Sequence, residues 1–343
     1  MVDYNNITVI IPSVEFNDYL KKCIDSIFEI SLKINVIILL DSNSNGIAEY
    51  KNDYNNLIIK VIKKKLNISQ KRNFGAKLTN TDFIAFIDSD AFPEINWLKN
   101  SFEIIEKNPD IYIVGGPNIS PFMQDWQKKI IGEVQKSFLI TGKWNFQKRI
   151  SMSRFTENLY SCNMFMRLDT YLDYNGMNEE LETGEDYDFC NKVNDNKKRV
   201  FFNQNSIVYH YDRGFKNFLI QKIIRGFTIV DQIKKKSKLI NKNFFEFYIY
   251  QLTPFYFFVF NIISILILFN FVKTIYYFKI FIVIIYLIYL LLALFSMKYI
   301  HKKNIKYSFL ILIFILLGNI FIGLGSLLSL FNLNKIYKFY KNF

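Results

Sequence analysis

The chain has 343 residues, enough for one sizeable α/β domain and a smaller second part. Its net charge of +13 (43 basic minus 30 acidic residues) fits either a nucleic-acid partner or an anionic membrane surface. Much of the basic excess lies beside apolar stretches near the end of the chain, and the aromatic residues fill those stretches rather than alternate with basic residues on one face. The composition therefore favours membrane lipids as a partner and excludes nucleic acid.

Strand and helix patterns alternate from the first residues, which indicates βαβ units. A strand is predicted at Thr8 to Ile11, ending at Pro12, and a helix follows at Tyr19 to Ile30. Further strands are expected at Asn35 to Leu40, ending at Asp41, and at Leu57 to Ile62. A helix at Ser69 to Leu78 then leads into a fully apolar strand at Phe83 to Ile87.

The end of that apolar strand carries two acidic residues, Asp88 and Asp90. Residues two apart on a strand point the same way, so the two side chains leave the sheet edge together. Ligands of parallel sheets collect at the carboxyl ends of strands, and paired carboxylates suit Mg²⁺ or Mn²⁺ bound to substrate phosphates. In the alternative interpretation, Ser89 or Asp90 only caps a helix that starts near Pro93.

The later part of the first 230 residues is less regular. A helix is expected at Ile95 to Glu106 and a strand at Ile111 to Val114, followed by a turn at Gly115 to Pro117. Beyond these, we expect a strand at Asn158 to Met166, a helix at Tyr187 to Val193 and one or two strands at Val200 to Tyr209. The three cysteines, Cys23, Cys162 and Cys190, lack metal-ligand spacing and are expected to be reduced structural thiols.

The C-terminal part is expected to be a membrane domain. Three stretches are long and apolar enough to span a bilayer: Ile249 to Val272, Ile280 to Met297 and Tyr307 to Leu333. Buried helices of a soluble core are the alternative. Lysines flanking the first stretch and in the second loop place the large domain in the cytoplasm by the positive-inside rule, and the start of the chain shows no secretory signal.

Several motifs together, in a fixed order, resemble the family 2 glycosyltransferases. They are the strand Thr8 to Pro12, the helix Tyr19 to Ile27, the acidic loop Asp41 to Gly46, the Arg-Asn-x-Gly segment Arg72 to Gly75, the Asp-x-Asp segment Asp88 to Asp90 and the Gly-Glu-Asp-x-Asp segment Gly184 to Asp188. Any one of these is weak alone, but their order is specific.

The resemblance implies an α/β domain of GT-A fold, with a mixed sheet and helices on both faces. The expected domains are residues 1–230 for the transferase, 231–248 for a basic connector and 249–343 for three transmembrane helices. The implied activity is that of a metal-dependent, inverting glycosyltransferase of hexosyl type in the cell (plasma or inner) membrane. Its expected partners are a nucleotide-sugar donor, a lipid-linked or glycan acceptor and membrane lipids.

The resemblance also assigns roles at the donor site. Pro12 falls in the donor-binding set, and Asp41 resembles the carboxylate that binds the nucleotide base, although a simple turn residue is the alternative. Arg72 resembles the arginine that reaches the donor's ribose or phosphates, the alternative being a solvated helix face with Lys71 and Lys77. Asp88 resembles the residue that contacts ribose and metal, and Asp90 the direct ligand of Mn²⁺ or Mg²⁺.

A second acidic site follows at Glu185 and Asp186. Asp186 resembles the general base that takes the acceptor proton, and Glu185 falls in the acceptor or diphosphate region. The alternative is that these carboxylates only favour a helix N-terminus. His210 stands where similar enzymes place a histidine near the metal, and a histidine bonded to backbone is equally compatible.

Arg225 is placed in the acceptor or diphosphate region because Gln221 and Arg225 resemble the Gln-x-x-Arg-Trp motif of processive synthases. The spacing is longer and Gly226 replaces Trp, which disfavours processive synthesis. Transfer of one sugar is therefore predicted. Two alternatives stay open: a polyprenyl-phosphate sugar synthase, and a non-catalytic membrane scaffold that kept the fold.

Overall fold

The computed structural model describes residues 2–41, 54–64, 66–181, 183–195, 198–234, 252–269, 276–297 and 307–333. The chain divides into two compact units. The first comprises Met1–Pro121 and Phe146–Tyr211, and the second comprises Phe122–Asn145 and Asp212–Phe343. The second unit thus takes up a segment from the middle of the sequence that the sequence analysis did not separate from its surroundings.

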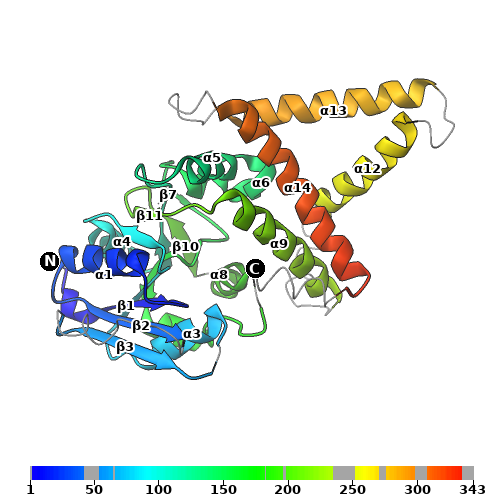
Figure 1. Cartoon of the computed structure of the whole chain (residues 1–343). Coiled ribbons are helices and arrows are strands. Elements are labelled where there is room, and N and C mark those ends of the chain that lie inside the picture. The colour runs from blue at the N-terminus through cyan, green and yellow to red at the C-terminus, as the bar shows by residue number, and fades with distance from the viewer. Residues whose placement is uncertain are drawn as a thin grey trace. The chain divides into compact units, whose positions relative to one another are not determined.

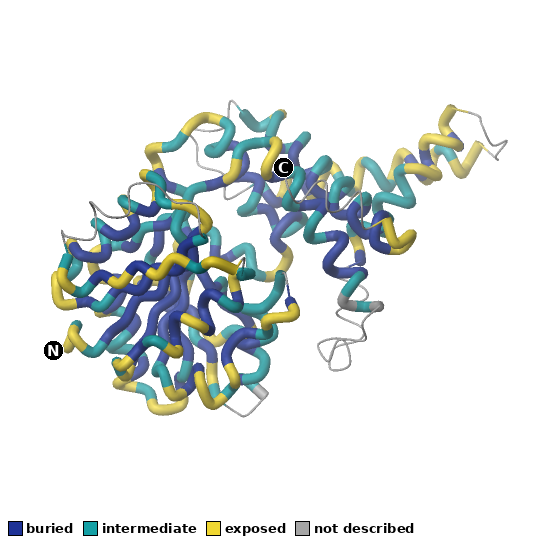
Figure 2. Tube along the Cα trace, turned by 60° about the horizontal axis from the view of Figure 1, so that its bottom comes forward, coloured by how far each residue is buried: buried dark blue, intermediate teal, exposed yellow. Residues whose placement is uncertain are grey.

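An eight-stranded sheet forms the centre of the first unit, in the order β3-β2-β1-β4-β9-β6-β10-β8. Strands β1, β2 and β3 lie side by side in Figure 1. Its strands are β1 (Ile7–Pro12), β2 (Asn35–Asp41), β3 (Leu57–Ile62), β4 (Phe83–Ile87), β6 (Ile111–Gly115), β8 (Arg154–Phe155), β9 (Asn163–Arg167) and β10 (Arg199–Phe202). Strand β1 pairs in parallel with β2 and β4, whereas β9 runs antiparallel to β4 and β6. The predicted mixed sheet is confirmed, and its central strands are buried (Figure 2).

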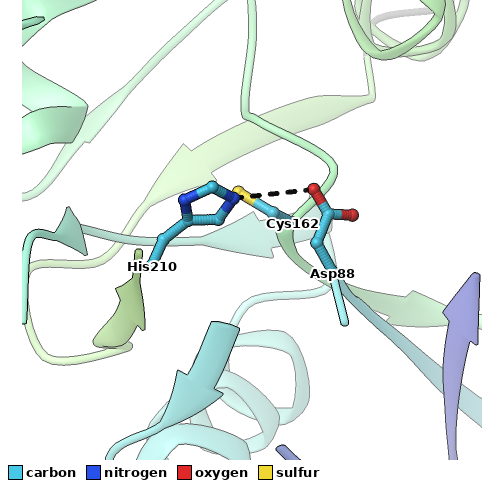
Figure 3. Close-up of side chains that lie close together, drawn as sticks. All are labelled: Asp88, Cys162 and His210. Carbon is cyan, nitrogen blue, oxygen red and sulfur yellow. Dashed lines mark ion pairs between the residues drawn. The ribbon is translucent and has the colours of Figure 1, made fainter. Parts of the chain in front are cut away.

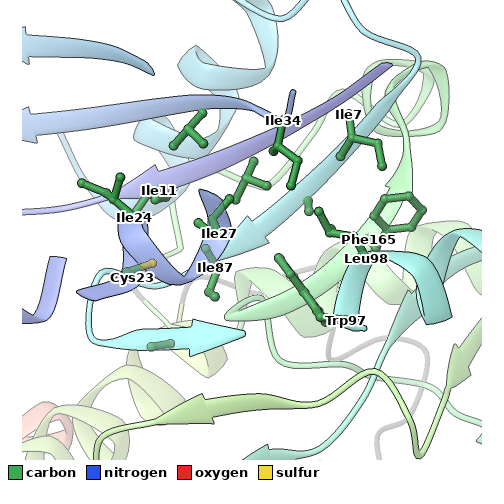
Figure 4. Packing of buried hydrophobic residues seen from close by; sticks show 14 of the residues in the cluster. Ile7, Ile11, Cys23, Ile24, Ile27, Ile34, Ile87, Trp97, Leu98 and Phe165 are labelled. Atoms are coloured by element: carbon green, nitrogen blue, oxygen red, sulfur yellow. The ribbon is translucent and has the colours of Figure 1, made fainter. Parts of the chain in front are cut away.

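Helices cover both faces of this sheet. They are α1 (Asp18–Ile30), α3 (Ile68–Lys77), α4 (Trp97–Lys107), α7 (Leu168–Asp173) and α8 (Glu185–Asp195), after a short 3-10 turn at Tyr4–Asn6. Alternate residues of β1, such as Ile7 and Ile11, pack with Cys23 of α1 and Trp97 of α4 on one face (Figure 4). On the other face Phe86 packs on Tyr171 and Tyr171 on Phe189, which ties β4 to α7 and α8.

Helix α3 lies unusually close to the sheet because of one glycine. A Cβ atom on Gly75 would stand 2.5 Å from Cγ2 of Ile10 on β1 and 3.1 Å from Cδ2 of Leu39 on β2. No side chain fits without displacing the strand residues. The close approach brings the residues that precede Gly75 on α3 to the carboxyl ends of β1, β2 and β4.

A second, three-stranded sheet has the order β5-β11-β7, formed by β5 (Ala91–Pro93), β7 (Asn118–Ile119) and β11 (Val208–His210). The alternative interpretation started a helix near Pro93, which is wrong: Pro93 ends β5, and α4 begins after Asn96, close to the predicted start at Ile95. Proline is tolerated here because β5 is an edge strand, where a missing N–H breaks no ladder. The interpretation of Ser89 or Asp90 as a helix cap is therefore also wrong.

The second unit is helical. It contains α5 (Trp126–Gln135), α6 (Phe138–Thr141), α9 (Phe215–Lys234), α12 (Leu252–Leu268), α13 (Tyr276–Ser296) and α14 (Ser308–Leu330), and a 3-10 stretch at Gly142–Lys148 leads back to the first unit. The chain thus leaves the first unit at residue 211, earlier than the domain limit predicted at residue 230, and most of the predicted connector 231–248 lies outside the described residues.

Helix α9 packs tightly along α14. A Cβ atom on Gly226 would lie 1.8 Å from the carbonyl oxygen of Ile322, and Oγ of Ser326 donates to the carbonyl of Gly226 over 3.2 Å. The tryptophan that processive synthases carry after their arginine therefore has no room at Gly226. This contact gives a physical reason for the departure from their motif.

Two helices, α13 with 21 residues and α14 with 23, are long and apolar enough to cross a membrane. Only 11% of the apolar window of α13 is buried inside the structure, against 50% for α14. The first predicted span corresponds to α12, of which 17 residues are described, and the residues 249–251 and 270–272 of that span lie outside the described part of the chain. The lysine-rich flanks used to predict orientation lie mostly outside the described residues, so three spans and their orientation stay predictions.

Candidate active site

Asp88 and Asp90 lie at the carboxyl end of β4, as expected. The five residues of β4 are all buried, and the chain turns directly afterwards into β5, with the amide of Ala91 donating to the carbonyl of Asp88 over 3.1 Å. The Asp90 side chain keeps 44% of its surface exposed, against 27% for Asp88. Of the two carboxylates, Asp90 is the more accessible to a ligand.

Strand β11 carries His210 to the same place. His210 pairs with Ala91 across the small sheet, and the amide of Tyr211 donates to the carbonyl of Asp90 over 3.0 Å. As a result, Nε2 of His210 lies 3.4 Å from Oδ1 of Asp90. The same atom lies 3.8 Å from Oδ2 of Asp88 (Figure 3). Burial alone would lower the pKa of His210, but the charge of Asp90 and the hydrogen bond with Asp88 outweigh it and raise the pKa.

Asp88, Asp90 and His210 are side chains of the types that hold a hard divalent cation. Both measured separations, 3.4 and 3.8 Å, involve Nε2 of His210, and ligands at about 2.1 Å from one octahedral ion lie about 3 Å apart. Carboxylate oxygens and an imidazole nitrogen are donors that Mn²⁺ accepts and that also occur around Mg²⁺. The carboxylates favour a positive charge at this position, which is the condition a cation site must meet.

Cys162 lies beside this cluster, a position that sequence reasoning did not foresee. The ligand atoms of Asp88, Cys162 and His210 all lie within 4.8 Å of one another (Figure 3). The thiol is fully engaged, since Sγ of Cys162 lies 3.2 Å from Oδ1 of Asn118, to which it donates. Burial and the nearby Asp88 charge raise the pKa of the thiol, so it stays protonated. A protonated thiol is a poor ligand for a hard ion, so Cys162 lines the site without binding the cation.

Helix α3 organises the rest of the site through three successive side chains, Lys71, Arg72 and Asn73. The helix starts at a capping box, in which the Asn67 side chain accepts from the amide of Gln70 and the Gln70 side chain accepts from the amide of Asn67. All three side chains are buried, at 3%, 1% and 8% exposure. The alternative of a solvated helix face is therefore wrong.

Arg72 joins the two acidic clusters. Its Nη2 lies 2.7 Å from Oδ1 of Asp88, and its Nη1 lies 3.1 Å from Oε1 of Glu185. Residues far apart in sequence thus meet at one guanidinium. Burial alone would raise the pKa of Asp88, but Arg72 and His210 outweigh it and hold that pKa well below its usual range, so the carboxylate stays ionised.

Lys71 ties together the ends of β1 and β2. Its Nζ lies 2.9 Å from Oδ1 of Asp41 and donates to the carbonyl of Ser13 over 2.6 Å. Pro12, buried at the end of β1, lies opposite Leu39 of β2. Asp41 is therefore the fixed last residue of a strand, held by a buried cation. The loop 42–53 that follows it lies outside the described residues.

Asn73 holds the segment that leads into α8. Its Nδ2 donates to the carbonyl of Met177 and to Oε1 of Glu179, both over 2.9 Å, and its Oδ1 accepts from the amide of Met177 over 3.0 Å. The hydroxyl of Tyr171 also donates to Oδ1 of Asn73 over 2.5 Å. The Arg-Asn pair of α3 thus fixes both the first residue of α8 and the approach to it.

Helix α8 begins at Glu185, so the acidic residues stand in its first turn, as the helix-terminus interpretation also expects. That interpretation does not account for the ion pair between Glu185 and Arg72. The next residue, Asp186, accepts from the amide of Tyr187 over 2.8 Å. Burial, followed by the neighbouring charge of Glu185, raises the pKa of Asp186 to about 7. A carboxylate with such a pKa is suited to proton transfer near neutral pH.

Arg225 lies in the second unit, on α9, where its Nη1 lies 3.5 Å from the carbonyl of Ile140, to which it donates. The other predicted site residues, Pro12, Asp41, Arg72, Asp88, Asp90, Glu185, Asp186 and His210, all belong to the first unit. Arg225 is thus separate from them in the division of the chain. Its role in the acceptor or diphosphate region stays a prediction.

Known glycosyltransferases are similar to this chain. Residues 8–170 match the model of the family described as Glycosyl transferase family 2. The chain is 26% identical over 279 residues to the dolichyl N-acetyl-alpha-D-glucosaminyl phosphate 3-beta-D-2,3-diacetamido-2,3-dideoxy-beta-D-glucuronosyltransferase of Methanococcus voltae, covering 77% of this chain and 82% of that one. It is 24% identical over 193 residues to the glucosyl-dolichyl phosphate glucuronosyltransferase of Haloferax volcanii, covering 52% and 59%.

Among solved structures, the chain resembles the mannosyltransferase PcManGT from Pyrobaculum calidifontis in complex with GDP-Man and Mn²⁺. The TM-score is 0.62 at 11% identity, over 95% of this chain and 87% of that one. This likeness shows the fold, a mixed sheet of GT-A type followed by long apolar helices. Residues 8–170 thus form a domain that matches the glycosyltransferases of family 2.

Proposed function

We propose that the protein transfers one sugar from a nucleotide-diphosphate sugar to a lipid-linked sugar at the membrane, with inversion at the sugar carbon. One observation carries this proposal: Arg72 brings Asp88, at the donor edge of the sheet, and Glu185, next to the predicted base, to a single guanidinium. Donor and acceptor groups must lie within bonding reach for a single displacement. A cluster of this kind is what such a displacement requires.

On the donor side, the Asp41 carboxylate would bind the nucleotide base, and Lys71 would hold that carboxylate in place. Asp90 and His210, with Asp88, would hold Mn²⁺ or Mg²⁺, which when bound neutralises charge on the diphosphate. Arg72 is 1% exposed and occupied by two carboxylates, so its contribution would be to position them rather than to reach the donor.

On the acceptor side, Asp186 would accept the proton of the acceptor hydroxyl while that oxygen attacks the sugar carbon opposite the diphosphate. A pKa of about 7 allows the carboxylate to be ionised before the reaction and a competent proton acceptor during it. Glu185 faces Arg72 and would fix the start of α8. Inversion follows from one displacement from the opposite side.

The acceptor class rests on the relatives, whose names describe transfer to dolichyl-phosphate-linked sugars. The apolar helices α13 and α14 would anchor the protein beside such an acceptor. A polyprenyl-phosphate sugar synthase is the second candidate in the same class, but there the acceptor is already an anion. The raised pKa of Asp186 favours the hydroxyl acceptor, because only that acceptor needs a base.

The proposal is tested by incubating the purified full chain in detergent with a panel of nucleotide sugars and lipid-linked sugar acceptors, with and without Mn²⁺. We expect one donor to give a product whose new linkage is inverted, and NMR of the anomeric proton checks this. A protein that binds no nucleotide sugar in the presence of Mn²⁺ would instead be a scaffold that kept only the fold.

The pH dependence of transfer follows from Asp186. The base acts in its ionised form, so the rate at saturating substrate should fall about tenfold per pH unit below pH 7 and level off above it. Glu185→Gln removes a negative neighbour and frees the Arg72 charge, and both effects lower the pKa of Asp186. The pH below which the transfer rate falls should therefore be lower in Glu185→Gln than in the wild type. An unchanged pH–rate profile would contradict the assignment of Asp186 as the base.

Lys71 should control donor affinity. Lys71→Met leaves Asp41 without its cation and the carbonyl of Ser13 without a donor, so we expect the donor KM to rise about tenfold while kcat changes less. Lys77→Met, at an exposed position of the same helix, serves as the control and should leave both constants unchanged. Equal changes in the two variants, measured by initial rates, would show that Lys71 has no specific link to the donor.

A further inference from the structure

Three exposed apolar side chains form a short tip of the second unit that ends at the first residue of α5. Phe122, Met123 and Trp126 expose 72%, 79% and 49% of their surface. The following residues of α5, in contrast, include Ile130, Ile131 and Val134, which are fully buried. Large apolar side chains that stay exposed next to a well-packed helix usually mark a surface that is covered by something else.

The tip is held in a defined conformation. Two hydrogen bonds connect the side chain of Gln124 to Asp212. Nε2 of Gln124 donates to Oδ2 of Asp212 over 2.9 Å, and the backbone amide of Asp212 donates to Oε1 of Gln124 over 3.1 Å. The ring of Trp126 packs edge-on against Phe215, with centroids 5.4 Å apart. The exposed side chains are therefore presented by a fixed scaffold.

That scaffold is continuous with the apolar helices. The ring of Phe215 stacks on Phe314 of α14 at 4.2 Å, and the buried face of α5 packs with Ile311 and Ile315 near the start of α14. Oγ of Ser137, just before α6, donates to Oγ of Ser296 at the end of α13 over 2.8 Å. The tip thus belongs to the same packed group as the end of α13 and the start of α14 (Figure 1).

Basic residues lie near the tip, which also contains the exposed Asp125, paired with Lys128 over 3.6 Å. Nζ of Lys129 lies 5.3 Å from the centre of the Phe122 ring, and Arg213 and Lys216 are exposed beside Asp212 and Phe215. Aromatic and apolar side chains next to lysine and arginine are typical of the boundary between lipid headgroups and acyl chains. Anionic headgroups would attract the basic residues while the apolar tip enters the upper acyl region.

We infer that the tip formed by Phe122, Met123 and Trp126 docks into the headgroup boundary of the lipid bilayer, at the level where α13 ends and α14 begins. The inference rests on the proposed membrane anchoring. A lipid partner is favoured because the same packed group includes α13, whose apolar surface is almost entirely uncovered by protein. The tip would give the protein a membrane contact besides the spanning helices.

The test places a spin label at Met123→Cys in the full chain, reconstituted in nanodiscs that contain anionic phospholipid. Cys23, Cys162 and Cys190 are buried and should not react with the label. Leu32→Cys, at a 70% exposed apolar position of the first unit, is the matched control. We expect the Met123 label to be more accessible to oxygen, which partitions into lipid, than to a water-soluble nickel complex, and the Leu32 label to show the reverse.

Each other outcome overturns the inference in a distinguishable way. A Met123 label that is accessible to the nickel complex, in protein that has entered the nanodiscs, leaves the anchoring intact but shows that the tip lies in water. A label shielded from both reagents shows that protein covers the tip. A chain that does not enter nanodiscs overturns both the inference and the proposed anchoring.

Discussion

Asp186→Asn is expected to lower the rate of transfer to a sugar hydroxyl by about 10²- to 10⁴-fold, the range that a general base contributes. Asparagine keeps the size of the side chain and can still accept from the amide of Tyr187, so the fold of α8 should persist. The fall of the rate below pH 7 should also disappear from the pH–rate profile, because the group that titrates there is gone. Initial rates across a pH series measure both effects.

The same variant separates the two candidate acceptors. A polyprenyl phosphate attacks as an anion, so a synthase of that kind should retain much more activity after Asp186→Asn than an enzyme that deprotonates a hydroxyl. Asp173→Asn, an exposed carboxylate in the same unit, is the control for the loss of one charge and should keep the wild-type rate. Equal losses on both acceptor types would exclude the synthase, and unchanged transfer to the hydroxyl would show that Asp186 is not the base.

The edge of the sheet was predictable because it depends on local pattern. The apolar strand Phe83–Ile87 can only be central, and the residues after it must then lie at the ligand-binding edge. The mixed sheet and the start of α8 also agree with expectation, and His210 lies beside Asp90, whereas its role as a metal ligand stays a prediction. In each case the order of the motifs along the chain predicted where the element or residue lies.

The partners of the basic residues on α3 were not predictable. Arg72 is predicted to reach the donor, with a solvated helix face beside Lys71 and Lys77 as the alternative. Lys71 and Arg72 are instead buried, because Gly75 lets the helix approach the sheet until its side chains meet Asp41, Asp88 and Glu185. Charge pairs between segments more than 100 residues apart, such as Arg72 and Glu185, have no signal in a single sequence. The Lys-Arg-Asn sequence beside a glycine was the only hint.

The division of the chain into two units was also not predictable, because it depends on contacts between segments that are far apart in the sequence. The segment Phe122–Asn145 has a short apolar face that fits the core of either unit, and only the packing of Ile130 and Ile131 against α14 shows where it belongs. Cys162 was taken as a structural thiol, which agrees with its hydrogen bond to Asn118, but its position beside Asp88 and His210 depends on the pairing of β9 with β4.

Asp90→Asn is expected to abolish most Mn²⁺ binding in the presence of a nucleoside diphosphate. It should also reduce transfer by about 100-fold or more, because loss of an outer-shell partner of a metal ligand alone costs about 10- to 100-fold. Asp90 is the most exposed of the three candidate ligands and lies closest to His210, whereas Asp88 is already paired with Arg72. The fold should be unaffected. The EPR signal of free Mn²⁺, titrated against protein with UDP or GDP, measures the binding without relying on activity.

Comparison with Asp88→Ala sharpens this prediction. That change leaves the buried Arg72 with Glu185 as its remaining ion pair, so the melting temperature should fall, which is not expected for Asp90→Asn. Asp110→Asn, an exposed carboxylate whose partner is Arg199, should change neither property. If Asp90→Asn binds Mn²⁺ as tightly as the wild type, the cation site does not lie at the end of β4. In that case the residues at the end of β4 have a structural role, in which Asp88 holds Arg72 of α3 through an ion pair.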